Sequence, residues 1–174
     1  MALFKPDYYV RNYKNIDLDK LKKKGIKLLL CDIDNTLVAW NDPHSNEKVR
    51  AFLDDVKRHG IVPVLISNNT PHRAAKFSKD LNVEKVYGFS LKPFPHNLKR
   101  AMKDYGVRPE QTAMLGDQLL TDMLAGRMAG VYTILTHPIV DDDKFDTRIN
   151  RALESLIYKQ YERNGTFHRG EFDD

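Results

Sequence analysis

The residues best suited to chemistry are two aspartates that follow an apolar run near residue 30. Asp32 comes directly after the apolar run Leu28 to Cys31. Asp34 follows two positions later, and Thr36 two positions after that. Two carboxylates at the end of a buried strand repel each other and are costly to desolvate unless a metal ion or a reaction uses them. We therefore predict that Asp32 is a nucleophile and that Asp34 is its acid/base partner.

Further polar side chains follow other apolar runs along the chain. Ser67 and Asn68 come after one run, Lys92 after another, and Asp117 and Asp122 after a third. In an open α/β sheet the carboxyl ends of the strands meet where ligands bind. Any one of these residues alone could be a turn or cap residue, but their coincidence at predicted strand ends indicates a single site.

Short apolar runs alternate with segments of helical periodicity, which is typical of a parallel sheet covered by helices on both faces. The predicted strands are 26–33, 61–67, 85–89, 112–115 and 131–135. The predicted helices are 45–59, with Ser45 as N-cap, then 71–81, 95–105, 119–128 and 145–161, the last with an apolar face of Ile149, Leu153, Leu156 and Ile157. The predicted fold class is α/β, a Rossmann-like doubly wound, mainly parallel five-stranded sheet without a large cap domain.

Composition is that of a globular domain. The chain has 174 residues, of which 41% are apolar and 30% charged, enough for one hydrophobic core. Its apolar runs are far shorter than the ~20 residues that cross a bilayer, and its one cysteine cannot form an internal disulfide. We expect a cytoplasmic protein with a basic N-terminal segment (1–25), a catalytic domain (26–163) and a disordered tail (164–174).

The N-terminal segment concentrates positive charge in a chain whose net charge is +4. Such a run is most often a solvated face. The interleaved aromatic residues Phe4, Tyr8, Tyr9 and Tyr13 also allow attraction to anionic lipid headgroups, which would place the protein peripherally at the inner face of the membrane. No nucleic-acid partner is expected, because no recognised binding module accompanies the charge.

The strings CDIDNTL, SNN, KP and GDQLLTD, in this order, resemble the haloacid dehalogenase superfamily of phosphohydrolases. The resemblance covers residues from about 26 to 138. Within that superfamily the chain is similar to subfamily IIIA, the small bacterial phosphatases related to mitochondrial phosphatidylglycerophosphate phosphatase. The resemblance implies a phosphomonoester hydrolase that uses Mg²⁺ and forms an aspartyl phosphate.

The resemblance also implies roles for the polar residues. Asp32, the backbone carbonyl of Asp34, and Asp117 would hold Mg²⁺, which offsets the repulsion between a carboxylate and a phosphate dianion. Lys92 would stabilise the phosphoryl charge and orient the nucleophile. Asp122 would not bind the metal ion directly but would steer metal-bound waters or Lys92. The remaining expected substrate-binding residues are Thr36, which also fixes the loop presenting the nucleophile, Ser67 and Asn68.

Substrate choice in this superfamily is largely set by cap domains, and the segments 37–60 and 70–84 are too short to hold one. An open site suits a bulky substrate such as a lipid headgroup, or a second subunit could close it in a homo-oligomer. The resemblance points to phosphatidylglycerophosphate as the phosphomonoester substrate. A soluble sugar or nucleotide phosphate is the alternative.

Two other classes of protein remain open, a catalytically silent scaffold and a phosphoreceiver-like binding module. A phosphoreceiver carries its phosphoacceptor at the end of its third strand, and no aspartate ends the third predicted strand here. A cysteine phosphatase would need an arginine about six residues after Cys31, where this chain has Leu37. We therefore interpret Cys31 as a buried strand residue.

Overall fold

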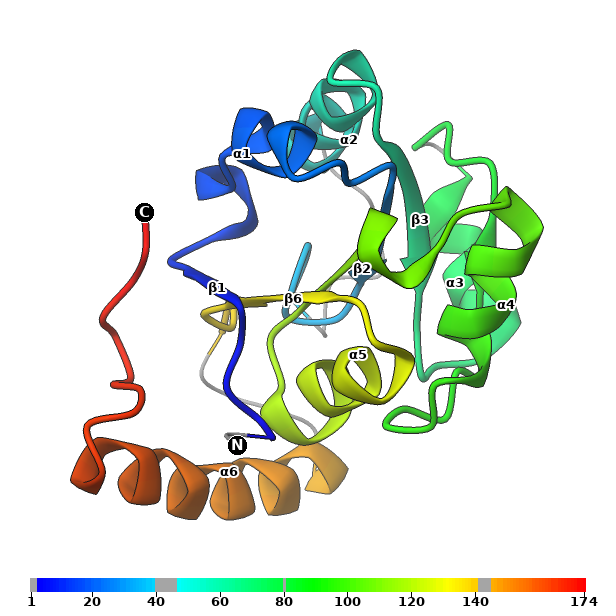
Figure 1. Ribbon diagram of the computed structural model, residues 1–174. Helices are drawn as coiled ribbons and strands as arrows, with labels where there is room; N and C mark the ends of the chain where they lie inside the picture. Colours follow the sequence, from blue (N-terminus) through cyan, green and yellow to red (C-terminus); the bar gives the residue numbers. More distant parts are fainter. Residues whose placement is uncertain (1–2, 40–46, 80, 141–144) are drawn as a thin grey trace.

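The structure, a computed structural model, describes residues 3–39, 47–79, 81–140 and 145–174 (Figure 1). Its centre is β2 (Leu28–Asp32), whose residues are all buried, as expected of a continuous apolar run in a parallel sheet. It pairs with β3 (Val62–Ile66) on one side and with β5 (Thr112–Gly116) on the other. The strand that carries the predicted nucleophile is therefore held from both sides.

The sheet has six parallel strands, one more than the sequence predicts, in the order β1-β6-β5-β2-β3-β4. β4 (Val86–Tyr87) and β6 (Tyr132–Thr136) were expected. The additional strand, β1 (Tyr8–Val10), comes from the basic N-terminal segment and pairs with β6. Three residues surrounded by charges give too short an apolar pattern to indicate a strand. The α/β class and the parallel sheet are confirmed.

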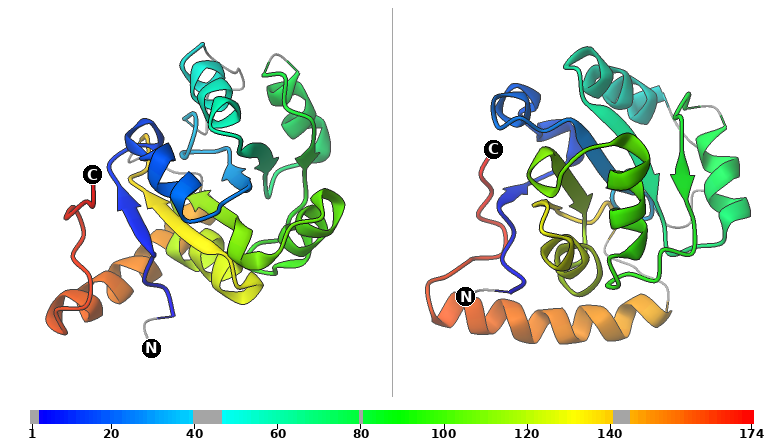
Figure 2. Two further views of the ribbon diagram at one scale, coloured as in Figure 1. Left: turned by 45° about the horizontal axis from the view of Figure 1, so that its top comes forward. Right: turned by 45° about the vertical axis from the view of Figure 1, so that its right-hand side comes forward.

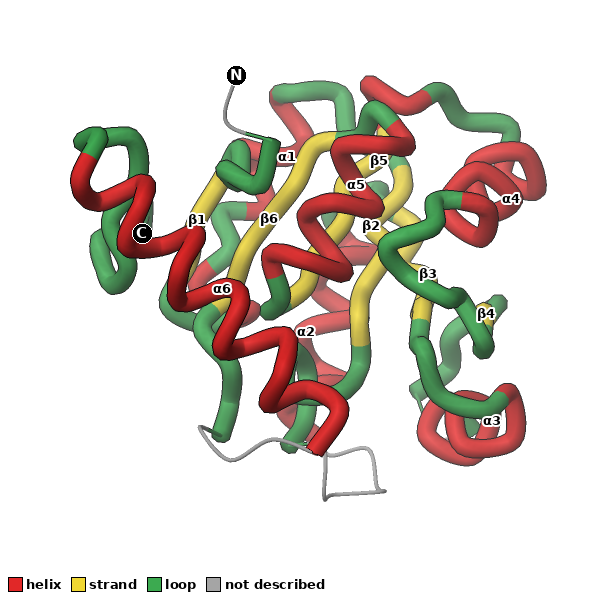
Figure 3. The backbone as a smooth tube through the Cα atoms, turned by 90° about the horizontal axis from the view of Figure 1, so that it is seen from below, coloured by secondary structure: helices red, strands yellow, loops and turns green. Residues whose placement is uncertain are grey.

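Helices cover both faces of the sheet (Figures 2 and 3). Alternate residues of β2 face opposite layers: Leu29 and Cys31 belong to one buried apolar cluster, and Leu28 and Leu30 to the other. The first cluster includes residues of α1 (Leu18–Lys23), α2 (Glu47–Arg58) and α3 (Pro71–Ser78), and the second includes residues of α4 (His96–Tyr105) and α5 (Leu124–Ala129). Two 3₁₀ turns, Tyr13–Asn15 and Pro109–Gln111, complete the connections. Ser45, the predicted N-cap of α2, lies outside the described residues.

A third apolar cluster joins the two ends of the chain. Tyr9 of β1 packs against residues of α6 (Phe145–Arg163) and of the C-terminal segment. Its ring lies 5.0 Å from that of Phe167 and 4.7 Å from that of Phe172, measured between centroids. Its backbone N–H donates to Asp173 Oδ2 at 2.7 Å. The sequence predicts a disordered tail at 164–174, but these aromatic and hydrogen-bond contacts hold the segment against the edge strand (Figure 2).

The three tyrosines of the N-terminal segment belong to the core, and Phe4 is partly buried. Tyr8, Tyr9 and Tyr13 are each at most 3% exposed, so they do not form a lipid-facing surface. Lysines cover some of these rings from outside, as Lys20 does over Tyr8 at 3.9 Å from Nζ to the ring centroid. Among the described residues no helix is long and apolar enough to cross a bilayer.

Candidate active site

A tight loop after β2 presents the first group of polar side chains. Asn35 has a φ of 62°, a left-handed conformation that asparagine tolerates better than most residues, and its N–H donates to the carbonyl of Val38 at 2.6 Å. The hydroxyl of Thr36 is thereby turned back toward the strand end, 3.2 Å from Asp32 Oδ2 and 3.1 Å from Asp117 Oδ1. The loop therefore joins the carboxyl ends of β2 and β5.

Lys92 reaches the same point from the loop after β4. Its Nζ lies 2.5 Å from Asp32 Oδ1 and 2.6 Å from Asp122 Oδ1, and its side chain is 2% exposed. Burial alone would lower the pKa of this lysine, but Asp122 and Asp32 together raise it above its ordinary value. The ammonium is therefore a permanent cation aimed at the predicted nucleophile.

Negative charge still exceeds positive charge in the buried centre. One oxygen from each of Asp32, Asp117 and Asp122 lies within 4.8 Å of the other two. Burial raises the pKa of Asp32 despite Lys92, with further increases from Asp122, Asp117 and Asp34. Burial also raises the pKa of Asp117 to about 7.

The single hydroxyl proton of Thr36 can be donated to only one of the two carboxylates that it contacts. Buried, crowded oxygen ligands of this kind fit a hard divalent cation, which would remove the repulsion that raises the pKa of Asp32 and Asp117.

Asp122 organises the loop after β5. It lies in a short π-helical turn, Leu119–Met123, and its Oδ2 accepts from the N–H of Asp117 at 3.2 Å and from that of Gln118 at 3.1 Å. Its other oxygen contacts Lys92. Asp122 thus fixes both a loop backbone and the lysine, an arrangement that suits the expected supporting role.

Gly116 is required by the close approach of Asp122. A Cβ at position 116 would lie 2.3 Å from the Cβ of Asp122 and 2.4 Å from its Oδ2. We expect Gly116→Ala to push Asp122 away from Lys92, lowering kcat by about tenfold or more while costing about 1 to 3 kcal/mol of stability. Steady-state kinetics and chemical denaturation measure both effects. Gly106→Ala, where a Cβ meets nothing within 4 Å but φ is 61°, controls for backbone strain alone and should keep kcat near wild type.

The segment after β3 connects the remaining predicted residues. Asn69 donates through Nδ2 to Asp34 Oδ2, and its N–H donates to Ser67 Oγ at 3.0 Å. Asn68 Oδ1 accepts from the N–H of Lys92 at 2.9 Å. The side chain of Asn68 therefore holds the lysine loop. Hydrogen bonds join six of the eight predicted residues into one network: Asp32, Thr36, Asn68, Lys92, Asp117 and Asp122. The other two, Asp34 and Ser67, are joined to each other through Asn69.

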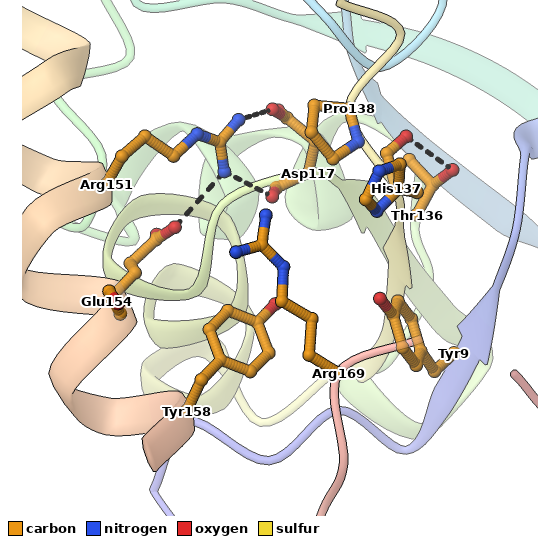
Figure 4. A pocket seen from close by; sticks show the side chains of 10 residues that line it. Tyr9, Asp117, Thr136, His137, Pro138, Arg151, Glu154, Tyr158 and Arg169 are labelled. Carbon is orange, nitrogen blue, oxygen red and sulfur yellow. Dashed lines mark hydrogen bonds and ion pairs between the residues drawn. The ribbon is translucent and has the colours of Figure 1, made fainter. Parts of the chain in front are cut away.

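Sequence reasoning missed two charged residues of α6 that contact this network. The guanidinium of Arg151 donates to the backbone oxygen of Asp117 at 2.9 Å and, through Nη2, to its Oδ2 (Figure 4). Glu154, 2% exposed, accepts from Arg151 at 3.1 Å and from the N–H of Leu120 at 3.0 Å. The signal that could have identified them is a pair of opposite charges three positions apart on a predicted helix.

The apolar face predicted for this helix was largely wrong. Ile149, Leu153 and Leu156 are 58%, 50% and 63% exposed, and only Ile157 packs against the third apolar cluster. The face turned to the sheet instead carries Arg151 and Glu154. Arg151 forms ion pairs with Asp117 and Glu154, and Glu154 accepts from the N–H of Leu120, and these contacts offset the cost of burial.

Cys31 has the structural role expected from the sequence. It is 0% exposed, and burial raises the pKa of its thiol well above the ordinary value. The thiol contacts only its own strand in the described hydrogen bonds, at 3.8 Å from the carbonyl oxygen of Leu29. A protonated thiol within the sheet is a poor nucleophile.

Comparison with known proteins identifies the family. The family model described as haloacid dehalogenase-like hydrolase matches residues 43–130. Over 162 residues, which are 93% of this chain and 94% of the relative, the sequence is 36% identical to "Probable phosphatase YqeG" of Bacillus subtilis (strain 168). The chain belongs to the haloacid dehalogenase-like hydrolases. The resemblance seen in the sequence motifs is confirmed, and this family member is a phosphoric monoester hydrolase.

Two further similarities concern substrate and fold. The chain is 28% identical to phosphatidylglycerophosphate phosphatase 1 of Arabidopsis thaliana over 171 residues, covering 92% of the chain and 49% of that protein. A crystal structure of 3-deoxy-D-manno-octulosonate 8-phosphate phosphatase from Moraxella catarrhalis, with magnesium and phosphate, superposes with a TM-score of 0.53 at 19% identity, over 83% of this chain and 91% of that one. The second similarity supports the fold of this hydrolase.

Proposed function

We propose that this phosphatase hydrolyses phosphatidylglycerophosphate to phosphatidylglycerol and phosphate, in a Mg²⁺-dependent reaction that passes through a phosphoryl group on Asp32. The observation that carries the chemistry is the buried contact between Asp32 and Lys92 beside two further carboxylates. The relative from Arabidopsis thaliana supports the choice of substrate.

Mg²⁺ would be held by Asp32, Asp117 and the backbone carbonyl of Asp34, with Asp122 supporting the site from the side of Lys92. The bound ion supplies positive charge that offsets the repulsion between the phosphate dianion and the carboxylates. Arg151 keeps one oxygen of Asp117 turned toward α6, while the other oxygen faces Thr36. Asp117 therefore directs a single carboxylate oxygen toward the metal site.

Asp32 and Asp34 divide the chemistry between them. A carboxylate oxygen of Asp32 attacks phosphorus, and the bond from phosphorus to the leaving oxygen breaks. Asp34 is less buried than Asp32 and its carboxyl group is oriented by Asn69, so it can protonate the leaving oxygen. It then removes a proton from the water that attacks the aspartyl phosphate, which regenerates Asp32 and releases phosphate.

Lys92 and Ser67 would bind the transferred phosphoryl group. Lys92 already contacts Asp32, so its charge lies next to the oxygens that become more negative in the transition state. The hydroxyl of Ser67 accepts from the N–H of Asn69, and its own hydrogen donates to none of the residues that the structure describes, which leaves that hydrogen for a phosphoryl oxygen.

A lipid substrate is compatible with the open edge of the sheet. A cap domain could be inserted after β2 or after β3. In the described residues the next helices after these strands are α2 and α3, whose buried residues pack on the sheet. Exposed apolar side chains flank Lys92 in its loop, with Leu91 at 60% and Phe94 at 63% exposure. These side chains would contact the apolar part of the membrane surface on which the enzyme acts.

The test compares phosphate release from phosphatidylglycerophosphate in mixed micelles with release from glucose 6-phosphate, adenosine monophosphate and glycerol 3-phosphate. We expect kcat/KM to be highest for the lipid by about 100-fold, with activity lost in chelator and restored by Mg²⁺. Preference for a soluble ester would contradict the lipid substrate and favour the alternative. Absence of turnover on every substrate would favour a silent scaffold.

A further inference from the structure

A cavity of about 200 Å³ lies on the far side of Asp117 from Thr36 and Asp32. Its walls come from the ends of β1 and β6, from α6 and from the C-terminal segment (Figure 4). It is smaller than the ~300 to 1,000 Å³ of sites that enclose a whole small-molecule ligand. It therefore has room for part of a substrate whose reacting group lies elsewhere.

The cavity contains one guanidinium that no carboxylate of the described residues neutralises. Arg151 is paired with Asp117 and Glu154. Arg169 also lines the cavity, and its described contact is with the ring of Tyr158, 5.3 Å from the guanidinium carbon to the centroid. Within the described part of the chain no carboxylate forms an ion pair with Arg169. Its guanidinium points toward the side chains of Asp117 and Arg151 in Figure 4.

The segment that carries Arg169 is held in place on both sides. Its backbone N–H lies 3.4 Å from Glu162 Oε1, and the N–H of Gly170 lies 3.4 Å from the hydroxyl of Tyr9. Phe167 stacks on Tyr158 with centroids 5.8 Å apart. The guanidinium is therefore presented at the cavity by a segment packed on two tyrosines.

We propose that this cavity binds a second anionic group of the substrate, of the phosphate type, and that Arg169 recognises it. The inference rests on the proposed function and deepens it: the headgroup of phosphatidylglycerophosphate carries a phosphodiester one glycerol unit away from the phosphomonoester. With the monoester at Asp32, the diester extends past Asp117 into the cavity, where a guanidinium donates two hydrogen bonds to its oxygens.

Binding is measured by calorimetry with Mg²⁺ in the Asp32→Asn variant, so that no ester is cleaved. The ligands are glycerol 3-phosphate, which has one phosphate, the deacylated headgroup glycerophosphoglycerophosphate, which has a monoester and a diester, and fructose 1,6-bisphosphate, which has two monoesters. We expect the deacylated headgroup to bind about tenfold or more tightly than glycerol 3-phosphate. When Arg169→Gln is added to the Asp32→Asn variant, the ratio of the affinity for the headgroup to that for glycerol 3-phosphate should fall close to one.

Arg163→Gln on the exposed end of α6 is the matched control, and it should keep the affinity ratio. Thermal unfolding of both double variants checks that the C-terminal segment remains packed. Equal affinities for the headgroup and glycerol 3-phosphate, or a ratio insensitive to Arg169→Gln, would overturn the subsite. Fructose 1,6-bisphosphate, but not the headgroup, could bind more tightly than glycerol 3-phosphate and lose this gain in affinity with Arg169→Gln. That result would support a site for a second anion and would overturn the lipid as the substrate.

Discussion

Asp32→Asn abolishes phosphate release, with an expected fall in kcat of about 10⁴-fold or more, because the amide that replaces the carboxylate beside Lys92 cannot attack phosphorus. The same substitution should not weaken the fold. Burial holds the pKa of Asp32 above its unfolded value, so ionised Asp32 opposes folding, and this penalty grows as the pH rises from the unfolded pKa toward the folded one.

The two effects are measured separately, kcat with phosphatidylglycerophosphate and the free energy of unfolding in chelator at neutral pH. We expect the metal-free variant to be as stable as the wild type or more stable. Asp54→Asn, on the exposed face of α2, is the control and should leave both quantities unchanged. Residual activity within about tenfold of wild type would show that Asp32 is not the nucleophile.

Lys92→Met should cause the largest combined loss of activity and stability. Removing the ammonium leaves Asp32 and Asp122 as buried carboxylates without their shared cation, and breaking a buried ion pair from one side costs about 3 to 5 kcal/mol. The loss of charge beside the phosphoryl group should lower kcat by about 10²- to 10³-fold. Chemical denaturation and steady-state kinetics measure the two losses.

Lys85→Met provides the matched comparison. Lys85 also pairs with an aspartate, Asp104, at 3.3 Å, but its side chain is 44% exposed, and exposed pairs contribute about 0 to 1 kcal/mol. A change in stability at Lys92 no larger than that at Lys85 would mean that the buried triad of charges does not hold the site together. Lys92→Arg should not restore activity, since the guanidinium is larger and planar.

The sequence predicts the centre of this fold well because the parallel strands are buried on both faces. β2 is a continuous apolar run that ends in a charged residue, so both its position and its functional end can be recognised. β1 lacks this signal: Tyr8 is buried in the first apolar cluster and Tyr9 is buried by α6 and the C-terminal segment, and neither contact is visible in a local pattern. The sixth strand therefore depends on tertiary packing.

The same reason explains which part of the site the sequence does not predict. Residues on strand ends can be placed from topology alone, because the carboxyl ends of parallel strands share one edge. Arg151 and Glu154 lie on a helix whose apolar residues suggest a different buried face. Their placement depends on ion pairs and hydrogen bonds with the loop after β5, a long-range interaction that helical periodicity does not encode.

The most direct test of the central claim is to locate the phosphoryl group during turnover. Wild-type protein and the Asp34→Asn variant are mixed with substrate and Mg²⁺, quenched in acid, reduced with borohydride, which converts aspartyl phosphate into homoserine, and digested with trypsin. The tryptic peptide from Leu28 to Lys48 contains both candidate aspartates. We predict homoserine at position 32, dependent on substrate and more abundant in Asp34→Asn, where hydrolysis of the intermediate is slow. Homoserine at position 34, or none in protein quenched during turnover, would contradict the account.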